Sequence, residues 1–365
     1  MGFNCGIVGL PNVGKSTLFN ALTETAAAEV ANYPFCTIEP NIGRVPVPDE
    51  RLDQIAEIAR PAKRTPTFLE FVDIAGLVRG ASKGEGLGNQ FLANIREVAA
   101  IIHVLRCFDD GVSHLEGIVD PIRDAETVMT ELLLADLETV ERQLEVAVKR
   151  ARGGDQEIQK RLSVLQRVAE ALRRGEPART VSISGELQPA MRQLQLLTAK
   201  PVLYVSNVDE ASAAAGNSFS NRVAELARAE QAGHVIISAA VEADVAQLVD
   251  PMEKREFLHS LGLEETGLAR VIRAGYDLLG LITFFTTGPK EARAWTVTRG
   301  TKAPQAAGAI HSDFERGFIR AETIAFADYV KFGGEQGARD AGRLRLEGRD
   351  YVVQDGDVLH FRFNV

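Results

Sequence analysis

The chain of 365 residues is long enough for two or three domains, and its 45% hydrophobic and 25% charged residues are ordinary for a soluble globular protein. Its 41 Lys and Arg residues against 50 Asp and Glu residues give a net charge of −9, which argues against a protein that coats DNA, and we expect no sequence-specific DNA partner. No apolar run approaches the roughly 18 residues of a membrane span. The N-terminal residues do not resemble a secretory signal, and the three cysteines lack metal-ligand or disulfide spacing, so we expect a cytoplasmic protein without a membrane partner.

The first predicted element is a strand over residues 3–8, and a phosphate-binding loop follows it directly. Residues Gly9–Ser16 read G-x-x-x-x-G-K-S, and a helix is predicted to open at Ser16, which is the context that this motif requires. The glycines let backbone N–H groups curl around phosphate oxygens, while Lys15 would act catalytically on the β- and γ-phosphates and Ser16 would ligate Mg²⁺. A glycine-containing turn before a core helix is the alternative. The predicted nucleotide-binding residues of this loop are Asn12, Val13, Gly14, Lys15, Ser16 and Thr17.

Two further segments are expected to complete the Mg²⁺ site. Asp73-Ile-Ala-Gly76 follows a predicted strand over residues 68–72, so that the Asp73 carboxylate would hold Mg²⁺ and the Gly76 N–H would approach the γ-phosphate. Thr37 lies in an irregular stretch, typical of a switch loop, and its hydroxyl would join the Mg²⁺ shell only when a γ-phosphate is present. The alternative for Thr37 is an ordinary loop hydroxyl. Cys36 beside it is either a small packed residue or a redox-sensitive one.

The predicted parallel sheet is interrupted by helices. Strand-like runs over residues 101–108, 202–206 and 235–238 continue the sheet on either side of the interruption. Two apolar seams with charged flanks lie between them, the second after Gly153-Gly154. The seams consist of Leu133, Leu137, Val140, Leu144 and Val148, and of Ile158, Leu162, Leu165, Ala169 and Leu172. We predict an antiparallel helical hairpin within residues 126–199, which is either a stiff insertion over the sheet or an arm that contacts a large partner.

A base-reading motif is expected where the strand over residues 202–206 ends. GTPases carry N-K-x-D here, and its Asp accepts hydrogen bonds from guanine N1–H and the 2-amino group. This chain reads Asn207-Val-Asp-Glu210, so Glu210 replaces that Asp and Val208 replaces the Lys. Adenine offers no donors to such a carboxylate, and the motif therefore favours ATP over GTP. The expected base pocket consists of Asn207, Val208, Glu210, Ser238 and Ala239.

The last 85 or so residues have a different character. Strands are predicted over residues 282–286, 294–297 and 359–363, with a turn at Asp355-Gly-Asp357 and a short helix near Thr301–Gly308. A small α+β module fits this pattern. The predicted division is a nucleotide-binding domain over residues 1–125 and 200–279, the helical insertion over 126–199, and the terminal module over 280–365.

Taken together, these motifs resemble those of the Obg-like ATPases of the YchF type. The resemblance is carried by Gly9–Ser16, by Tyr33–Gly43, by the long segment from Asp73 to Phe91 and by Asn207–Glu210, and it spans nearly the full length. It implies a P-loop NTPase fold with a Ras-like, mostly parallel sheet, an inserted antiparallel helical hairpin and a terminal TGS domain, which is a β-grasp fold. It also implies slow Mg²⁺-dependent ATP hydrolysis, association with the ribosome and a regulatory role in translation or stress response.

The expected hydrolysis lacks its usual water-orienting residue. Ras-like enzymes carry a Gln directly after D-x-x-G, and this chain has Leu77, so intrinsic turnover should be slow. Asn12 resembles the asparagine that coordinates a monovalent cation in related potassium-stimulated NTPases, and a bound K⁺ would neutralise developing charge. His114, in a polar loop after the strand over residues 101–108, is the second candidate, and a merely solvated side chain is its alternative. A GTPase with a degenerate base motif and a nucleotide-gated binding protein with incidental hydrolysis remain alternative functions.

Overall fold

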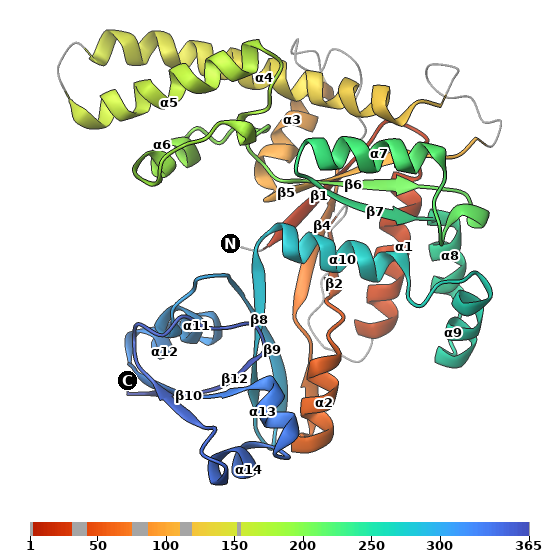
Figure 1. The fold of residues 1–365 in the computed structure, drawn as a ribbon, viewed down its shortest axis with the longest axis vertical. Coiled ribbons are helices and arrows are strands. Elements are labelled where there is room, and N and C mark those ends of the chain that lie inside the picture. Colours follow the sequence, from red (N-terminus) through yellow and green to blue (C-terminus); the bar gives the residue numbers. More distant parts are fainter. Residues whose placement is uncertain (1–2, 31–41, 75–86, 110–118, 152–154, 365) are drawn as a thin grey trace. The chain divides into compact units, whose positions relative to one another are not determined.

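A computed structural model describes residues 3–30, 42–74, 87–109, 119–151 and 155–364, and it divides into two compact units (Figure 1). Unit 1 comprises Met1–Gly43 and Glu70–Val271, and unit 2 comprises Arg44–Leu69 and Ile272–Val365. Both units are built from a sheet and helices, so the predicted α/β fold class is confirmed. Within the described ranges, no helix has the length and apolar character needed to cross a membrane.

A six-stranded sheet in the order β2-β4-β1-β5-β6-β7 lies mainly in unit 1, whose bounds leave out residues 44–46 of β2 and 68–69 of β4. From β4 to β7, neighbouring strands pair in parallel. The strands are β1 (Asn4–Val8), β2 (Ile42–Pro46), β4 (Phe68–Asp73), β5 (Ala100–Arg106), β6 (Val202–Asn207) and β7 (Gly233–Ile237). Every residue of β5 and β6 is buried, as expected for parallel strands covered on both faces. The chain order reverses around β1, and in such sheets the carboxyl ends of the strands at the reversal form the ligand site.

Some helices of unit 1 begin at side-chain caps. For example, α7 starts after a capping box in which the Asn217 side chain and the Ser220 side chain each bond the other residue's backbone N–H. Contacts join α7 to β6 and β7, and α1 to β1 and α8. The helices are α1 (Lys15–Val30), α3 (Leu87–Glu97), α7 (Ser218–Ala229), α8 (Ala239–Gln247) and α9 (Pro251–Ser260), and α10 (Gly267–Leu278) contains the boundary with unit 2.

The predicted helical hairpin is present as α4 (Pro121–Arg150) and α5 (Gln156–Arg173), which lie side by side and run in opposite directions (Figure 1). Asp120 and Asp155 cap their N-termini. The predicted seam of α4 is correct except at its end, where Val148 is 45% exposed and Ala147 is buried instead. The predicted seam of α5 is correct except at its start, since Ile158 is not part of the packed cluster. The step after Leu144 is three residues, because a straight helix has 3.6 residues per turn and cannot keep adding steps of four. The short helix α6 (Gln188–Gln193) follows.

Unit 2 contains a second six-stranded sheet, in the order β11-β10-β12-β8-β9-β3. β8 and β9 form an antiparallel hairpin, β12 pairs in parallel with β8, and α11 packs on one face, which is the predicted β-grasp arrangement. The strands are β3 (Lys63–Thr65), β8 (Leu281–Thr287), β9 (Glu291–Thr298), β10 (Phe318–Ala325), β11 (Arg345–Glu347) and β12 (Asp357–Phe363). The helices are α2 (Glu50–Ala59), α11 (Ala303–Ile310), α12 (Ser312–Arg316), α13 (Phe326–Lys331) and α14 (Glu335–Asp340).

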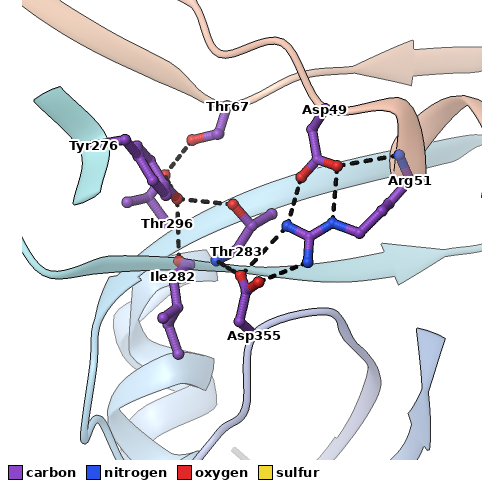
Figure 2. A network of polar contacts seen from close by, with 8 residues as sticks. All are labelled: Asp49, Arg51, Thr67, Tyr276, Ile282, Thr283, Thr296 and Asp355. Atoms are coloured by element: carbon purple, nitrogen blue, oxygen red, sulfur yellow. Dashed lines mark hydrogen bonds and ion pairs between the residues drawn. The ribbon is translucent and has the colours of Figure 1, made fainter. Parts of the chain in front are cut away.

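A polar network ties residues 44–69 to the rest of unit 2 (Figure 2). The Arg51 guanidinium donates to the Asp49 carboxylate at 2.8 Å and to the Asp355 carboxylate at 2.7 Å. Asp355 in turn accepts a hydrogen bond from the Thr283 N–H at 2.9 Å. The Tyr276 hydroxyl lies 2.8 Å from the Thr283 hydroxyl. The hydrogen bonds to Asp49 and then Asp355 favour the charged form of the half-buried Arg51 guanidinium more than partial burial disfavours it. The pKa of Arg51 is therefore raised above its ordinary value.

Candidate nucleotide-binding site

Two glycines of the predicted phosphate loop sit where no side chain fits. A Cβ on Gly9 would lie 2.8 Å from the Val104 carbonyl oxygen, and a Cβ on Gly14 would lie 2.2 Å from Asn207 Nδ2. Gly14 also has a φ of 89°, in the left-handed region that favours glycine. α1 begins directly after it, at Lys15. The strand, the tight loop and the helix N-terminus are therefore arranged as phosphate binding requires.

Lys15 and Asp73, which the sequence places in one site, are in contact. The Lys15 ammonium forms an ion pair with the Asp73 carboxylate and donates to the Ile74 carbonyl oxygen at 2.9 Å. Both side chains are mostly buried, with 11% and 18% of their surface exposed. The parallel register of β1 and β4 pairs Ile7 with Asp73 and brings the carboxylate to the end of β1. A bound phosphate would compete with Asp73 for the ammonium.

The donor set fits Mg²⁺. Ser16 lies in the first turn of α1 and is exposed, so its hydroxyl is available, and Asp73 supplies a carboxylate. Mg²⁺ prefers oxygen ligands and in nucleotide sites uses one or two protein side chains together with phosphates and water. Among the described residues, no group of three or more His, Cys, Asp or Glu side chains could hold a metal ion.

Asn207 connects the phosphate loop to the segment after β7. Its Nδ2 donates to the Val13 carbonyl oxygen at 2.9 Å, and its Oδ1 accepts from the Ala239 N–H at 2.9 Å. The side chain is only 2% exposed. The amide of Asn207 therefore fixes two loops against each other. Its role as a nucleotide contact, which the sequence predicts, stays a prediction. Val208 is likewise buried, and its N–H donates to the Ile237 carbonyl oxygen at 2.8 Å.

The remaining base-pocket candidates differ in how their polar atoms are used. Asp209 accepts from the Ser212 N–H at 2.9 Å and caps the short helix η5 (Glu210–Ser212). Glu210 is exposed, and no described residue hydrogen-bonds its carboxylate. The Ser238 hydroxyl is buried and lacks a hydrogen-bond partner among the described residues. Since buried polar groups are nearly always satisfied, the Ser238 hydroxyl marks a position where a ligand or water would be accommodated.

Arg106 is a buried cation that the sequence analysis missed. It ends β5, is 1% exposed, and donates to the Phe108 carbonyl oxygen at 3.2 Å and to the Asn12 carbonyl oxygen at 3.4 Å. Asn12 has a left-handed φ of 62°, which is uncommon for a residue other than glycine. The signal was present in the sequence, because Arg106 ends a strand in which His103 is the only other polar residue.

Thr37, Gly76 and His114 lie outside the described residues, as do Cys36 and Leu77. The roles predicted for them therefore stay predictions.

Comparison with known proteins agrees with this site. A family model described as "50S ribosome-binding GTPase" matches residues 4–143, and a model for the C-terminal region of YchF GTPases, described as a protein of unknown function, matches residues 281–364. "Ribosome-binding ATPase YchF" from Haemophilus influenzae is 58% identical and its namesake from Bacillus subtilis 54%, each with both chains covered completely. The solved structure of the Schizosaccharomyces pombe YchF GTPase matches with a TM-score of 0.90 at 38% identity, covering 99% of this chain and 98% of that one. The chain belongs to the YchF family.

Proposed function

We propose that this protein is a ribosome-associated ATPase that acts in the cytoplasm as a slow, Mg²⁺-dependent regulatory switch in translation or stress response. The observation that carries the proposal is full-length similarity, at 54–58% identity, to proteins named ribosome-binding ATPases. The complete phosphate loop, with Lys15 beside Asp73, supports it chemically.

The phosphate loop and the two oxygen donors would divide the work of nucleotide binding. Backbone N–H groups of Val13–Thr17 and the Lys15 ammonium would hold the phosphates, and Ser16 and Asp73, with Thr37, would hold Mg²⁺. When bound, Mg²⁺ neutralises charge on the β- and γ-phosphates. On this proposal Lys15 leaves Asp73 for the nucleotide, and the Gly76 N–H contacts the γ-phosphate.

ATP is proposed as the preferred nucleotide because the base motif ends in Glu210. The exposed carboxylate, one methylene longer than Asp, is not placed by a hydrogen bond to any described residue. Competition of ATP and GTP for a fluorescent nucleotide tests the preference, and Glu210→Asp combined with Val208→Lys is the matched variant. We expect ATP to compete better in the wild type and GTP to gain in the double variant. Equal competition by both nucleotides in the wild type would instead favour the GTPase with a degenerate motif.

Hydrolysis is proposed to need K⁺ at Asn12 and the loop that carries His114. Turnover should fall when Na⁺ replaces K⁺, and it should fall in Asn12→Ala and in His114→Ala. The His114→Ala variant should keep its K⁺ response, whereas Asn12→Ala should lose it. If turnover is the same in both salts and in both variants, neither group assists.

The ribosome tests whether hydrolysis is the output of a switch. Single-turnover ATP hydrolysis measured with and without ribosomes should show acceleration by ribosomes. A protein that cosediments with ribosomes when ATP is bound, but hydrolyses ATP no faster there, would instead be a nucleotide-gated binding protein.

A further inference from the structure

The Arg106 side chain is buried at the end of β5, next to the phosphate loop. All seven residues of this strand are buried, and only 1% of the surface of Arg106 is exposed. Burial of a guanidinium is costly unless its N–H groups find acceptors. Nε donates to the Phe108 carbonyl oxygen at 3.2 Å, and Nη1 donates to the Asn12 carbonyl oxygen at 3.4 Å. Arg106 therefore joins the end of β5 to the phosphate loop.

The chain around Arg106 is fixed by its neighbours. The Cys107 N–H donates to the Asn207 carbonyl oxygen at 2.8 Å, and the Cys107 carbonyl oxygen accepts from Asn217 Nδ2 at 2.7 Å. The Arg106 guanidinium lies 4.8 Å from the centroid of the Phe108 ring, a distance at which a cation and an aromatic face attract each other. The guanidinium thus reaches the phosphate loop from a firmly held base.

Two successive carbonyl groups of the phosphate loop are held by side chains from neighbouring strands. Arg106 at the end of β5 bonds the Asn12 carbonyl, and Asn207 at the end of β6 bonds the Val13 carbonyl at 2.9 Å. The described residues contain no cis peptide bond, and in a trans peptide the N–H points opposite to the C=O. Arg106 therefore sets the direction of the Val13 N–H, and Asn207 sets that of the Gly14 N–H.

The phosphate loop needs this support because part of its backbone is in an uncommon conformation. Asn12 has a φ of 62°, which is unfavourable for a residue other than glycine and persists only where the surroundings enforce it. The hydrogen bond from Arg106 to the Asn12 carbonyl opposes relaxation of this turn. The start of the loop is also packed against β5, since a Cβ on Gly9 would lie 2.8 Å from the Val104 carbonyl oxygen. β5 therefore shapes the loop at both places.

We propose that Arg106 is a positioning residue for nucleotide binding, which aims the Val13 N–H at the phosphates by holding the Asn12 carbonyl. The proposal rests on the phosphate contacts that the proposed function gives to Val13–Thr17. Backbone N–H groups of a phosphate loop bind phosphates that ATP and ADP share. Such contacts are made equally before and during hydrolysis, so their loss raises KM and leaves kcat nearly unchanged.

Steady-state ATP hydrolysis by Arg106→Met tests this division between KM and kcat. Methionine keeps an apolar side chain and removes both donors. KM for ATP should rise about tenfold, the usual effect of losing one hydrogen bond to a charged group, while kcat should change less than about threefold. Arg106→Lys keeps the charge but lacks the planar fork that bonds two carbonyls, so its KM should lie between those of the wild type and Arg106→Met.

Arg179→Met is the matched control for loss of a buried arginine. Only 14% of the Arg179 side chain is exposed, and it pairs with Glu230 at 2.6 Å. Both methionine variants should unfold at a lower temperature than the wild type, but Arg179→Met should keep the wild-type KM. If Arg106→Met keeps the wild-type KM and loses only kcat, Arg106 merely stabilises the fold and the proposal is wrong. If Arg106→Met does not fold, a wild-type KM in Arg106→Lys overturns the proposal instead.

Competition against a fluorescent nucleotide shows whether the effect lies at the phosphates. In Arg106→Met the inhibition constant of ADP should rise about tenfold, whereas that of adenosine, which has no phosphate, should stay the same. If adenosine loses as much affinity as ADP, Arg106 acts on the base pocket and the proposal is wrong.

Lys15→Ala in the same competition assay separates this proposal from the proposed function. If Lys15→Ala binds ADP as well as the wild type does, the phosphates do not bind at this loop, and the contacts in the proposed function fail together with the role of Arg106. If Lys15→Ala weakens ADP binding and Arg106→Met does not, the contacts in the proposed function stand and only the role of Arg106 fails.

Discussion

Polar groups at the carboxyl ends of the unit 1 strands and polar groups around Arg51 in unit 2 are bonded in different ways. In unit 1, Lys15 contacts a carboxylate that a phosphate would replace in the proposed function, and the Ser238 hydroxyl has no partner among the described residues. In unit 2, Arg51 is bonded to two carboxylates, and Asp355 bonds both Arg51 and the Thr283 N–H.

This difference separates polar groups that bind a ligand from polar groups that hold the fold. A group with an exchangeable or missing partner gains hydrogen bonds when a ligand arrives, so it contributes to binding. A group with all of its partners built in contributes to stability, and substitution there leaves those partners without their hydrogen bonds. Substitutions in the two regions should therefore affect different measurements.

The largest effect is expected for Lys15→Ala, which removes the exchangeable cation. ATP turnover should fall by at least about 100-fold, the usual cost of removing a group that stabilises transition-state charge. Lys160→Ala on α5, where the lysine is exposed and pairs only with Glu157, should change turnover little. Steady-state hydrolysis of both variants checks this. If the Lys15→Ala variant keeps half of the wild-type turnover, the phosphates do not bind at Lys15.

A second comparison uses two glycines with similar backbone angles. Gly14 and Gly175 have φ values of 89° and 78°, but a Cβ at Gly14 meets Asn207 and a Cβ at Gly175 meets nothing within 4 Å. Each substitution to Ala should cost about 1 kcal/mol of backbone strain. Only Gly14→Ala should also reduce ATP turnover, roughly 10- to 100-fold, because it displaces the loop.

Unfolding midpoints and ATP turnover, measured for both glycine variants, test this pair. Equal losses of ATP turnover in Gly14→Ala and Gly175→Ala would show that strain alone matters. In that case the contact between Gly14 and Asn207 would not set the shape of the loop.

The phosphate loop was predictable because its information is local. Gly9–Ser16 contains the turn, the cation and the helix start within eight consecutive residues, and the apolar run before it identifies the strand. The position of Asp73 beside Lys15 also followed, since carboxyl ends of parallel strands meet at one edge of the sheet.

The contacts that depend on distant chain segments were not predictable. β3 pairs with β9, more than 200 residues later, and its three residues Lys63–Thr65 carry no apolar pattern that would reveal a strand. The motif predicts Asn207 as a base contact but gives no sign of the hydrogen bonds from its amide to Val13 and Ala239, because those residues belong to two other loops. Arg106 was missed because burial of a charge depends on neighbours that the sequence does not show together.

A third test uses His103 on β5, a polar residue of unit 1 that is not among the candidate site residues. Its Nε2 is buried and has no hydrogen-bond partner among the described residues, and burial lowers its pKa to about 4 from an ordinary value of 6.5. Between those values the unfolded chain binds the proton more tightly, so this group's stabilisation is present above pH 6.5 and is lost as the pH falls towards 4. The wild type should therefore lose about 2 kcal/mol of its free energy of unfolding when the pH falls from 7.5 to 5.

His103→Phe should remove that loss and keep the ring contact with Tyr204, whose centroid is 5.7 Å away. Urea unfolding of the variant and the wild type at both pH values measures the difference. At pH 7.5 the two should be similar, and at pH 5 the variant should be the more stable. If the pH dependence is the same in the variant and the wild type, water solvates the Nε2 atom of His103. The lack of a protein partner would then not identify an unsatisfied polar group at this position.

The smallest effect on ATP turnover is expected for the polar network around Arg51 in unit 2, where the polar groups already bond one another. Arg51→Met keeps most of the apolar stem but leaves Asp49 and Asp355 without their cation, and it should lower the stability of unit 2 by about 1–2 kcal/mol. Arg64→Met breaks the ion pair with Asp53, where both side chains are about half exposed, and should cost less than about 0.5 kcal/mol. Neither variant should change ATP turnover at temperatures where both are folded. If Arg51→Met slows ATP hydrolysis without lowering the unfolding midpoint, the network takes part in the nucleotide cycle. The presence of built-in hydrogen-bond partners would then no longer distinguish structural polar groups from functional ones.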